Sequence, residues 1–205
     1  MDKPTYRGVS HQFAFFVALG AGAALIATAR TPWPLAIYVL GLAAMFGASA
    51  TYHRLARSPA ARRVWRRVDH SMIFVAIAAT YTPICAIALR GPSGTRLAML
   101  VWGGAALGIA RAIAWTRAPR AITAALYVAL GWALIAYLPE VRAALPLSAA
   151  ILIAIGGLLY TCGAIVYALR RPDPRPAVFG YHEVFHAFVV AAAACHFAAI
   201  VVIAR

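Results

Sequence analysis

The last apolar stretch, Val178–Ala204, decides the class of fold: it reads VFGYHEVFHAFVVAAAACHFAAIVVIA. As a helix it is long enough to cross about 30 Å of hydrocarbon. Its few polar residues include His182, Glu183 and His186, all close to its start. Because polar groups are costly inside a bilayer, such residues in a spanning segment indicate a functional site. The stretch therefore predicts a transmembrane helix that carries part of a polar site.

Six further apolar stretches precede this one. Hydrophobic residues make up 64% of the chain and charged residues only 12%, a balance that excludes an ordinary water-soluble domain. We therefore expect an all-α, polytopic membrane protein with seven transmembrane helices, forming a single domain over residues 1–205. The other predicted spans are Val9–Ala29, Leu35–Leu55, Val68–Leu89, Leu97–Trp115, Ala121–Leu138 and Leu147–Leu169.

The distribution of basic residues predicts the orientation of the chain. With the N-terminus inside, 14 of the 19 Lys and Arg residues, from Lys3 and Arg7 onward, fall on the inner face. Cytoplasmic loops retain Lys and Arg, so we expect a cytoplasmic N-terminus and an outer C-terminus. The same rule explains the net charge of +14, and no recognition motif accompanies it. We therefore expect no nucleic-acid partner.

This topology brings several polar residues to the cytoplasmic side of the membrane. His53 lies near the inner end of the second span, Asp69 in the first turn of the third, and His182 with His186 in the first two turns of the seventh. Imidazoles and carboxylates are typical metal ligands. Ser49 lies one turn from His53 on the same helix face. We expect a metal site formed by His53, Asp69, His182 and His186, with Ser49 beside it.

Each of these residues also has a simpler interpretation. A single histidine near a helix end is commonly an interfacial residue with one hydrogen bond. Asp69 could cap its helix or pair with Arg66 or Arg67. Ser49 could bond a carbonyl one turn back. Their occurrence together at one depth favours a site over these separate explanations.

The segment from His182 to His186 also reads H-E-x-x-H. In soluble zinc proteases this pattern supplies two ligands and a glutamate that acts as general base. Glu183 is rotated about 100° from His182 on a helix, so it flanks the ligand face. It could reach a metal-bound water or face Arg171 or Arg175. Glu183 is therefore a third catalytic candidate beside Asp69 and Ser49.

Three other histidines need an interpretation. His70 follows Asp69 and points about 100° away from it, so we expect a supporting or interfacial role. His196 lies about 15 Å deeper than His186 by helical rise, which predicts a buried, hydrogen-bonded residue outside the metal site. His11 lies near the start of the first span, and no sequence feature connects it with the site.

Several blocks of the chain together resemble the hemolysin III family, the bacterial branch of the progestin and adipoQ receptor superfamily. The resemblance covers nearly the whole chain in motif order and segment count. The blocks are SATYH at 49–53, VDHSMIF at 68–74, TYTP at 80–83, GYHEVFH at 180–186 and CHF at 195–197.

The resemblance implies a seven-helix protein of the bacterial cytoplasmic (inner) membrane with zinc near the cytoplasmic leaflet. Carried over by position, it makes His53, His182 and His186 ligands, while Asp69 contacts or positions the metal-bound water and Ser49 lies beside the metal. Glu183 departs from the animal adiponectin receptors, which carry an amide here, so its role is not inherited. The superfamily is similar to alkaline ceramidases, which implies hydrolysis of a lipid amide.

The leading hypothesis is a zinc-dependent hydrolase of a lipid amide or ester, with a membrane lipid as substrate or ligand. Asp69 would hold or deprotonate a water, and zinc, Ser49 or both would stabilise the oxyanion. If Asp69 binds zinc directly, four protein ligands close the site and favour a structural metal. Haem bound between paired histidines is an alternative to zinc, but an Asp at the same site favours zinc.

Three other functions stay open at this stage. The first is a non-catalytic sensor or regulator of membrane homeostasis with a structural zinc. The second is an intramembrane metalloprotease that depends on Glu183. The third is a cytolytic pore. The predicted spans carry no polar stripe, and this disfavours a pore.

Overall fold

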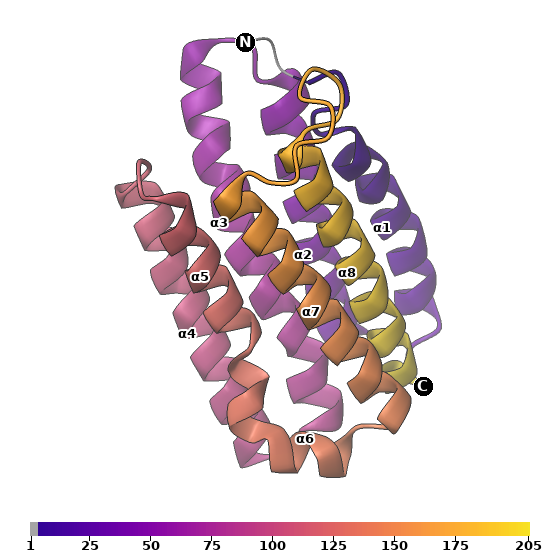
Figure 1. The fold of residues 1–205 in the computed structure, drawn as a ribbon. Coiled ribbons are helices and arrows are strands. Elements are labelled where there is room, and N and C mark those ends of the chain that lie inside the picture. Colours follow the sequence, from indigo (N-terminus) through magenta and orange to yellow (C-terminus); the bar gives the residue numbers. More distant parts are fainter. Residues whose placement is uncertain (1–3) are drawn as a thin grey trace.

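The computed structural model describes residues 4–205, so Lys3 lies outside the described range. Seven helical segments are long and apolar enough to cross a membrane, which confirms the all-α class and the number of spans. They form an upright bundle in which α1 begins and α8 ends at opposite ends (Figure 1). The elements are α1 (Val9–Ala27), α2 (Pro32–Ala50) with the π-helix η1 (Thr51–Leu55), α3 (Pro59–Pro83) with the π-helix η2 (Ile84–Ala88), α4 (Pro92–Ala114), α5 (Arg120–Gly131) with the 3₁₀-helix η3 (Ala133–Tyr137) and the short α6 (Leu138–Ala144), α7 (Leu147–Leu169) and α8 (Tyr181–Ala204).

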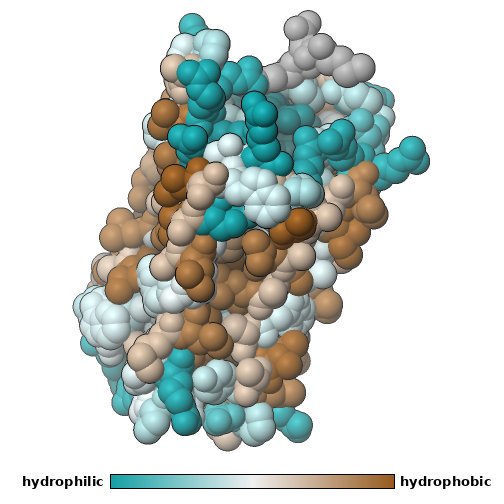
Figure 2. All heavy atoms as spheres, turned by 90° about the vertical axis from the view of Figure 1, so that its left-hand side faces the viewer, coloured by the Kyte–Doolittle hydropathy of each residue, from teal (hydrophilic) through white to brown (hydrophobic). Residues whose placement is uncertain are grey.

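The second and third spans form the centre of the bundle, and their most apolar portions have the highest buried share of the seven, 56% each. α1 packs against α2, and α7 packs against α8. Leu35, Tyr38 and Phe46 of α2 are almost completely buried in the core. On the face that Figure 2 shows, hydrophobic side chains cover the middle of the molecule, and hydrophilic ones lie at both ends and gather most densely at the end where α1 begins. The polar site predicted above belongs to that hydrophilic end.

α3 begins earlier than its hydropathy suggests. The Ser58 side chain accepts a hydrogen bond of 3.1 Å from Ala61 N, and Pro59 opens the first turn, which is a common start of a helix. The arginine-rich segment 62–67 is therefore helical, and the predicted boundary at Val68 was wrong. Asp69 lies almost three turns after Pro59, not in the first turn. The helix-capping interpretation of Asp69 is therefore wrong as well.

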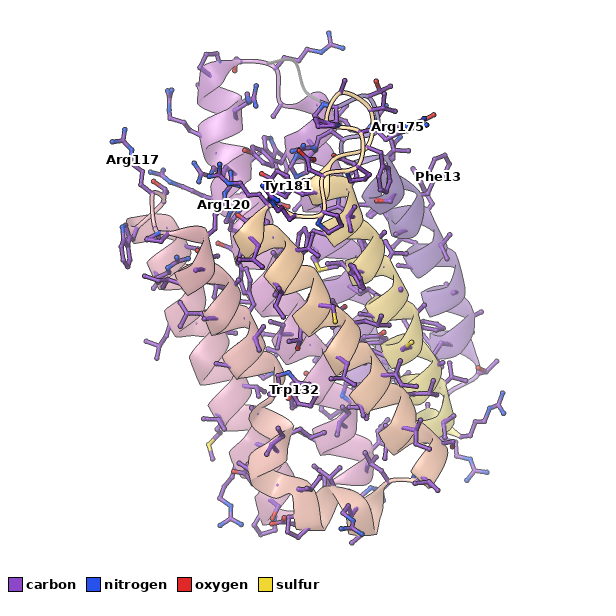
Figure 3. The ribbon with its side chains drawn as sticks, viewed as in Figure 1. Phe13, Arg117, Arg120, Trp132, Arg175 and Tyr181 are labelled. Atoms are coloured by element: carbon purple, nitrogen blue, oxygen red, sulfur yellow. The ribbon has the colours of Figure 1, made fainter. Side chains whose placement is uncertain are left out.

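The fifth span is interrupted, unlike the continuous stretch expected from Ala121 to Leu138. α5 ends at Gly131, and the chain continues through η3 and α6. The Tyr81 hydroxyl donates to Gly131 O at 2.6 Å and accepts from Leu134 N at 3.1 Å. These bonds satisfy backbone groups that the break leaves without helical partners, as a membrane interior requires. Trp132 lies at this break between α5 and α7 and donates to Thr161 Oγ1 at 3.0 Å (Figure 3).

We expect Gly94→Ala to lower stability markedly and Gly103→Ala to leave it unchanged or slightly raised. A Cβ at Gly94 would stand 1.9 Å from Leu89 O and 2.6 Å from Cys85 O, both backbone atoms, while a Cβ at Gly103 meets nothing within 4 Å. Overpacking of this kind costs about 1–3 kcal/mol or more. Thermal unfolding in detergent measures the difference, and equal midpoints for the two variants would contradict the packing at the start of α4.

Candidate metal centre and adjoining cavity

Three histidine side chains converge at the hydrophilic end of the bundle. His53, His182 and His186 each offer a ring nitrogen, and these nitrogens all lie within 4.8 Å of one another. Nε2 of His53 and Nε2 of His182 are 3.1 Å apart. The two segments that carry these residues, η1 and α8, are 129 positions apart along the chain. The predicted convergence of these three residues is therefore confirmed.

The donor set fits a transition-metal ion. A tetrahedral ion with metal–nitrogen bonds of about 2.0–2.1 Å holds two ligand nitrogens about 3.3 Å apart, close to the His53–His182 separation. His186 Nδ1 is buried and forms no hydrogen bond with any residue in the described part of the chain. Imidazole nitrogen is a common ligand for zinc and its neighbours in the transition series. The arrangement therefore has the ligand type and spacing of a metal site.

A local irregularity of the backbone positions His53. It lies in η1, where Ala56 N donates to Thr51 O at 2.9 Å, a wider turn than that of an α-helix. Such π-turns occur frequently at functional sites. Gly8 packs directly against this turn, because a Cβ at Gly8 would lie 2.7 Å from His53 Cβ. The φ of Gly8 is +79°, so glycine suits both the conformation and the close approach.

Asp69 lies near the histidines but does not belong to the group of three side chains whose ring nitrogens converge. It is buried and lines the same cavity as His182 and His186. Its Oδ2 lies 3.4 Å from His70 Nδ1, and the ion pairs among residues 4–205 do not join it to Arg66 or Arg67. Its interpretation as a partner of those arginines is therefore not supported. Its roles as ligand or as base stay predictions.

The site contains a fourth histidine that the sequence did not reveal. His11 of α1 is buried, and its ring is stacked on that of His186 with centroids 3.7 Å apart. Its Nδ1 forms a hydrogen bond of 2.8 Å with Ser49 Oγ. Ser49 therefore lies beside the site as expected, but its partner is His11 and not a carbonyl one turn back. No local sequence pattern marks His11, because its place in the site depends on how α1 packs beside α8.

A cavity of about 130 Å³ extends from this polar cluster into the bundle. Its polar wall includes His11, Ser49, Asp69, His182 and His186, and its remaining wall is mostly apolar. A second cavity of about 150 Å³ shares several lining residues with it and continues toward α6. These shared residues are Thr80, Tyr81, Gly131, Trp132, Gly157 and His196. The site therefore adjoins an elongated apolar space.

His196 is a hydrogen-bonded residue outside the metal site, as predicted. One of its ring nitrogens, Nε2, lies 3.2 Å from Ile153 O. Its ring also packs against α7, because a Cβ at Gly156 would stand 2.3 Å from His196 Cδ2. His196 therefore joins α8 to α7 in the interior.

Both carboxylate oxygens of Glu183 have partners away from the histidine cluster. Oε1 forms a salt bridge with Arg7 Nε, and Oε2 accepts from Gly180 N at 2.8 Å. Thr5 N and Tyr6 N add bonds of 3.1 and 3.2 Å to Ala177 O and Val178 O. Glu183 therefore links the segment before α1 to the start of α8. Among residues 4–205, its salt-bridge partner is neither Arg171 nor Arg175.

We expect Glu183→Gln to lower stability while the metal stays bound. Glu183 is 3% exposed, and breaking a buried ion pair leaves Arg7 without its counter-charge, a loss of up to about 3 kcal/mol. The measurements are thermal unfolding in detergent and metal content per chain. Arg7→Met should produce a similar loss, and the double variant should lose little more. Unchanged stability in Glu183→Gln would contradict the linking role.

Comparison with known proteins gives consistent matches over most of the chain. The family described as "Haemolysin-III related" matches residues 1–197. The "Hemolysin-3 homolog" of Bacillus subtilis (strain 168) is 32% identical over 130 residues, covering 63% of this chain and 58% of that protein. "Hemolysin-3" of Bacillus cereus is 28% identical over 170 residues, covering 83% and 74%. The "Heptahelical transmembrane protein ADIPOR2" of Oryza sativa subsp. japonica is 30% identical over 186 residues, covering 82% and 80%.

Proposed function

Because the chain belongs to the haemolysin-III-related family of integral membrane proteins, we propose that it is a zinc-dependent hydrolase of a lipid amide or ester. One observation carries this proposal: three histidine nitrogens lie within 4.8 Å of one another, and two of these histidines line a mostly apolar cavity together with Asp69 and Ser49. When bound, zinc supplies a Lewis acid that makes water a usable nucleophile near neutral pH. His53, His182 and His186 would hold it.

Asp69 would take up the proton that the attacking water loses. Its carboxylate lines the cavity beside His182 and His186, and His70 lies against its Oδ2 at 3.4 Å. A buried carboxylate in such a position is suited to orient a water and accept its proton. The proton would then pass to the leaving amine or alcohol. This role needs Asp69 near the metal but not bound to it.

Ser49 would donate a hydrogen bond to the oxyanion that forms on the scissile carbonyl. Its hydroxyl has one proton, and its Oγ is already bonded to His11 Nδ1. If His11 carries its proton on Nδ1, that nitrogen donates to Ser49 Oγ and leaves the serine proton available. His11 would thus be a positioning residue for Ser49, and it fixes the ring of His186 by stacking.

The apolar cavity would hold an acyl chain of the substrate. The two adjoining cavities of about 130 and 150 Å³ extend along α3, α5 and α7 from the polar cluster toward α6. Only 11% of the most apolar portion of the fifth span is buried, the lowest share of the seven, so this span lies at the outside of the bundle. We propose that the chain of a bilayer lipid enters here. The arginine-rich end would face the cytoplasm of a bacterial inner membrane.

The test is fatty-acid release by the full-length, zinc-loaded protein in detergent. The substrates are a ceramide, an N-acylethanolamine and a diacylglycerophospholipid, and mass spectrometry measures the released acid. We expect release from at least one class, loss after chelation and recovery after zinc addition. No release from any class, or release that chelation leaves unchanged, would overturn the proposal.

A regulator with a structural zinc is the second candidate, because His53 and His182 join the end of the second span to the start of the seventh. Zinc there would stabilise the bundle without turnover. An intramembrane protease is less well supported, since both oxygens of Glu183 are engaged by Arg7 and Gly180.

A further inference from the structure

A third and smaller hollow lies beside the histidine cavity at the hydrophilic end of the bundle. It has a volume of about 20 Å³. Four arginines from three helices line it, together with His70 and Thr123: Arg66 and Arg67 of α3, Arg111 of α4 and Arg120 of α5. Arg120 lies close to Tyr181 where α5 begins and α7 ends, whereas Arg117 points away from the bundle (Figure 3).

These four arginines have no acidic partner within the described part of the chain. The salt bridges among residues 4–205 involve Arg7 with Glu183 and His70 with Asp69. Neutral groups hold the two better covered arginines instead. Arg111 donates to Thr123 Oγ1 at 2.6 Å, and Arg120 donates to the Tyr181 hydroxyl at 2.6 Å. Several positive charges are thus gathered in one place, with neutral hydrogen-bond partners and aromatic rings but no carboxylate paired with them among residues 4–205.

The hollow also contains an unsatisfied buried donor. Arg111 Nε is buried and forms no hydrogen bond with any of the residues 4–205. A buried donor without a partner is unfavourable, and more so when the group is charged. A ligand with several acceptor oxygens would satisfy it. Guanidinium groups match the oxygens of phosphate in geometry and charge.

The position of the hollow indicates the source of the phosphate. His70 and Tyr167 line both this hollow and the larger, mostly apolar cavity, so the two spaces share a wall. Hydrophilic side chains gather around this end of the bundle, at the border of the apolar belt (Figure 2). A lipid headgroup lies at such a border, with its chains directed into the apolar region. A free phosphate ion, which has no acyl chain, would contact only the arginines.

We propose that Arg66, Arg67, Arg111 and Arg120 form a binding site for the phosphate of a lipid headgroup whose acyl chain enters the adjoining apolar cavity. This goes beyond the proposed function, because binding requires neither metal nor turnover. His70 and Tyr167 separate the headgroup from the histidine cluster. If the proposed hydrolysis is also correct, phosphate-bearing lipids are the preferred substrates of this protein.

The test is binding of phosphatidic acid to the full-length protein in detergent, measured by native mass spectrometry. We expect one phosphatidic acid per chain and much weaker binding of diacylglycerol with the same chains. Arg111→Gln/Arg120→Gln should lower the affinity for phosphatidic acid at least about tenfold, the scale of one lost charge-assisted bond. Arg67→Gln, which removes the charge from an exposed side chain, should also lower it.

The matched control is Arg62→Gln/Arg117→Gln, which removes the same charge from exposed positions outside the hollow. It should bind phosphatidic acid like the wild type. An equal loss in both double variants would overturn the site in favour of general charge attraction. Inorganic phosphate that binds as tightly as phosphatidic acid would overturn the lipid source. His182→Ala should bind phosphatidic acid normally, which separates this result from a failure of the proposed hydrolysis.

Discussion

Asp69→Asn is expected to keep one zinc per chain and to lower lipid hydrolysis about 100- to 10,000-fold. General base catalysis contributes an effect of this size, and an amide cannot accept the proton that the carboxylate takes up. The side chains are nearly equal in volume, so the buried position should tolerate the change. The measurements are metal content and fatty-acid release at matched protein concentration.

Glu140→Gln is the control for this result, because Glu140 is exposed and lies in α6, away from the histidine cluster. It should retain wild-type hydrolysis. Loss of zinc in Asp69→Asn would mean that Asp69 is a direct ligand. Wild-type hydrolysis in Asp69→Asn would contradict the role of Asp69 as base. A phenotype of expressing cells that Asp69→Asn leaves undiminished, with zinc retained, would favour the regulator.

His182→Ala is expected to lower zinc affinity by at least about 100-fold, because even residues that only support a ligand contribute 10- to 100-fold. The purified variant should contain well under one zinc per chain. Its thermal stability should no longer respond to added zinc, whereas binding to the folded state raises the midpoint of the wild type. Metal analysis and thermal unfolding in detergent measure both effects.

His196→Gln is the matched control, since His196 is also a histidine of α8 but lies outside the cluster and bonds Ile153 O. It should keep its zinc even if its stability falls. Equal zinc content in His182→Ala and the wild type would rule out the histidine cluster as the metal site.

The number of spans and the three converging histidines could be predicted from the sequence because both depend on simple periodic rules. Apolar length determines whether a helix crosses the bilayer, and the alternation of basic loops places segment ends on one side or the other. Ends that share a side have a limited area in which to meet. Topology therefore places His53, His182 and His186 at one end of the bundle, whereas their choice as the three ligands came from the family resemblance.

The boundary of α3 was missed because hydropathy is a poor guide where a spanning helix extends beyond the membrane. Arg62 and Arg63 make this segment polar, but they do not indicate a loop, because arginine favours helix formation. Ser58 followed by Pro59 was the local signal for the true start. Attention to capping residues would have moved Asp69 into the interior of its helix.

His11 and the partner of Glu183 could not be predicted, because they depend on contacts between distant helices. The position of His11 on His186 follows from how α1 packs beside α8, and no local pattern encodes that. Arg7 and Glu183 are 176 positions apart, and the sequence offers other arginines closer to the glutamate. Tertiary packing therefore determines both contacts.

The contact between the segment before α1 and the start of α8 orders the events of biosynthesis. The N-terminal residues leave the ribosome first, yet Arg7 meets Glu183 only when almost the whole chain has been made. His53 likewise can approach His182 and His186 only after the final helix has entered the bilayer. Nascent chains that stop before this helix contain a single member of the triad. A metal held by all three histidines, as proposed above, could therefore be acquired only after α8 has been made.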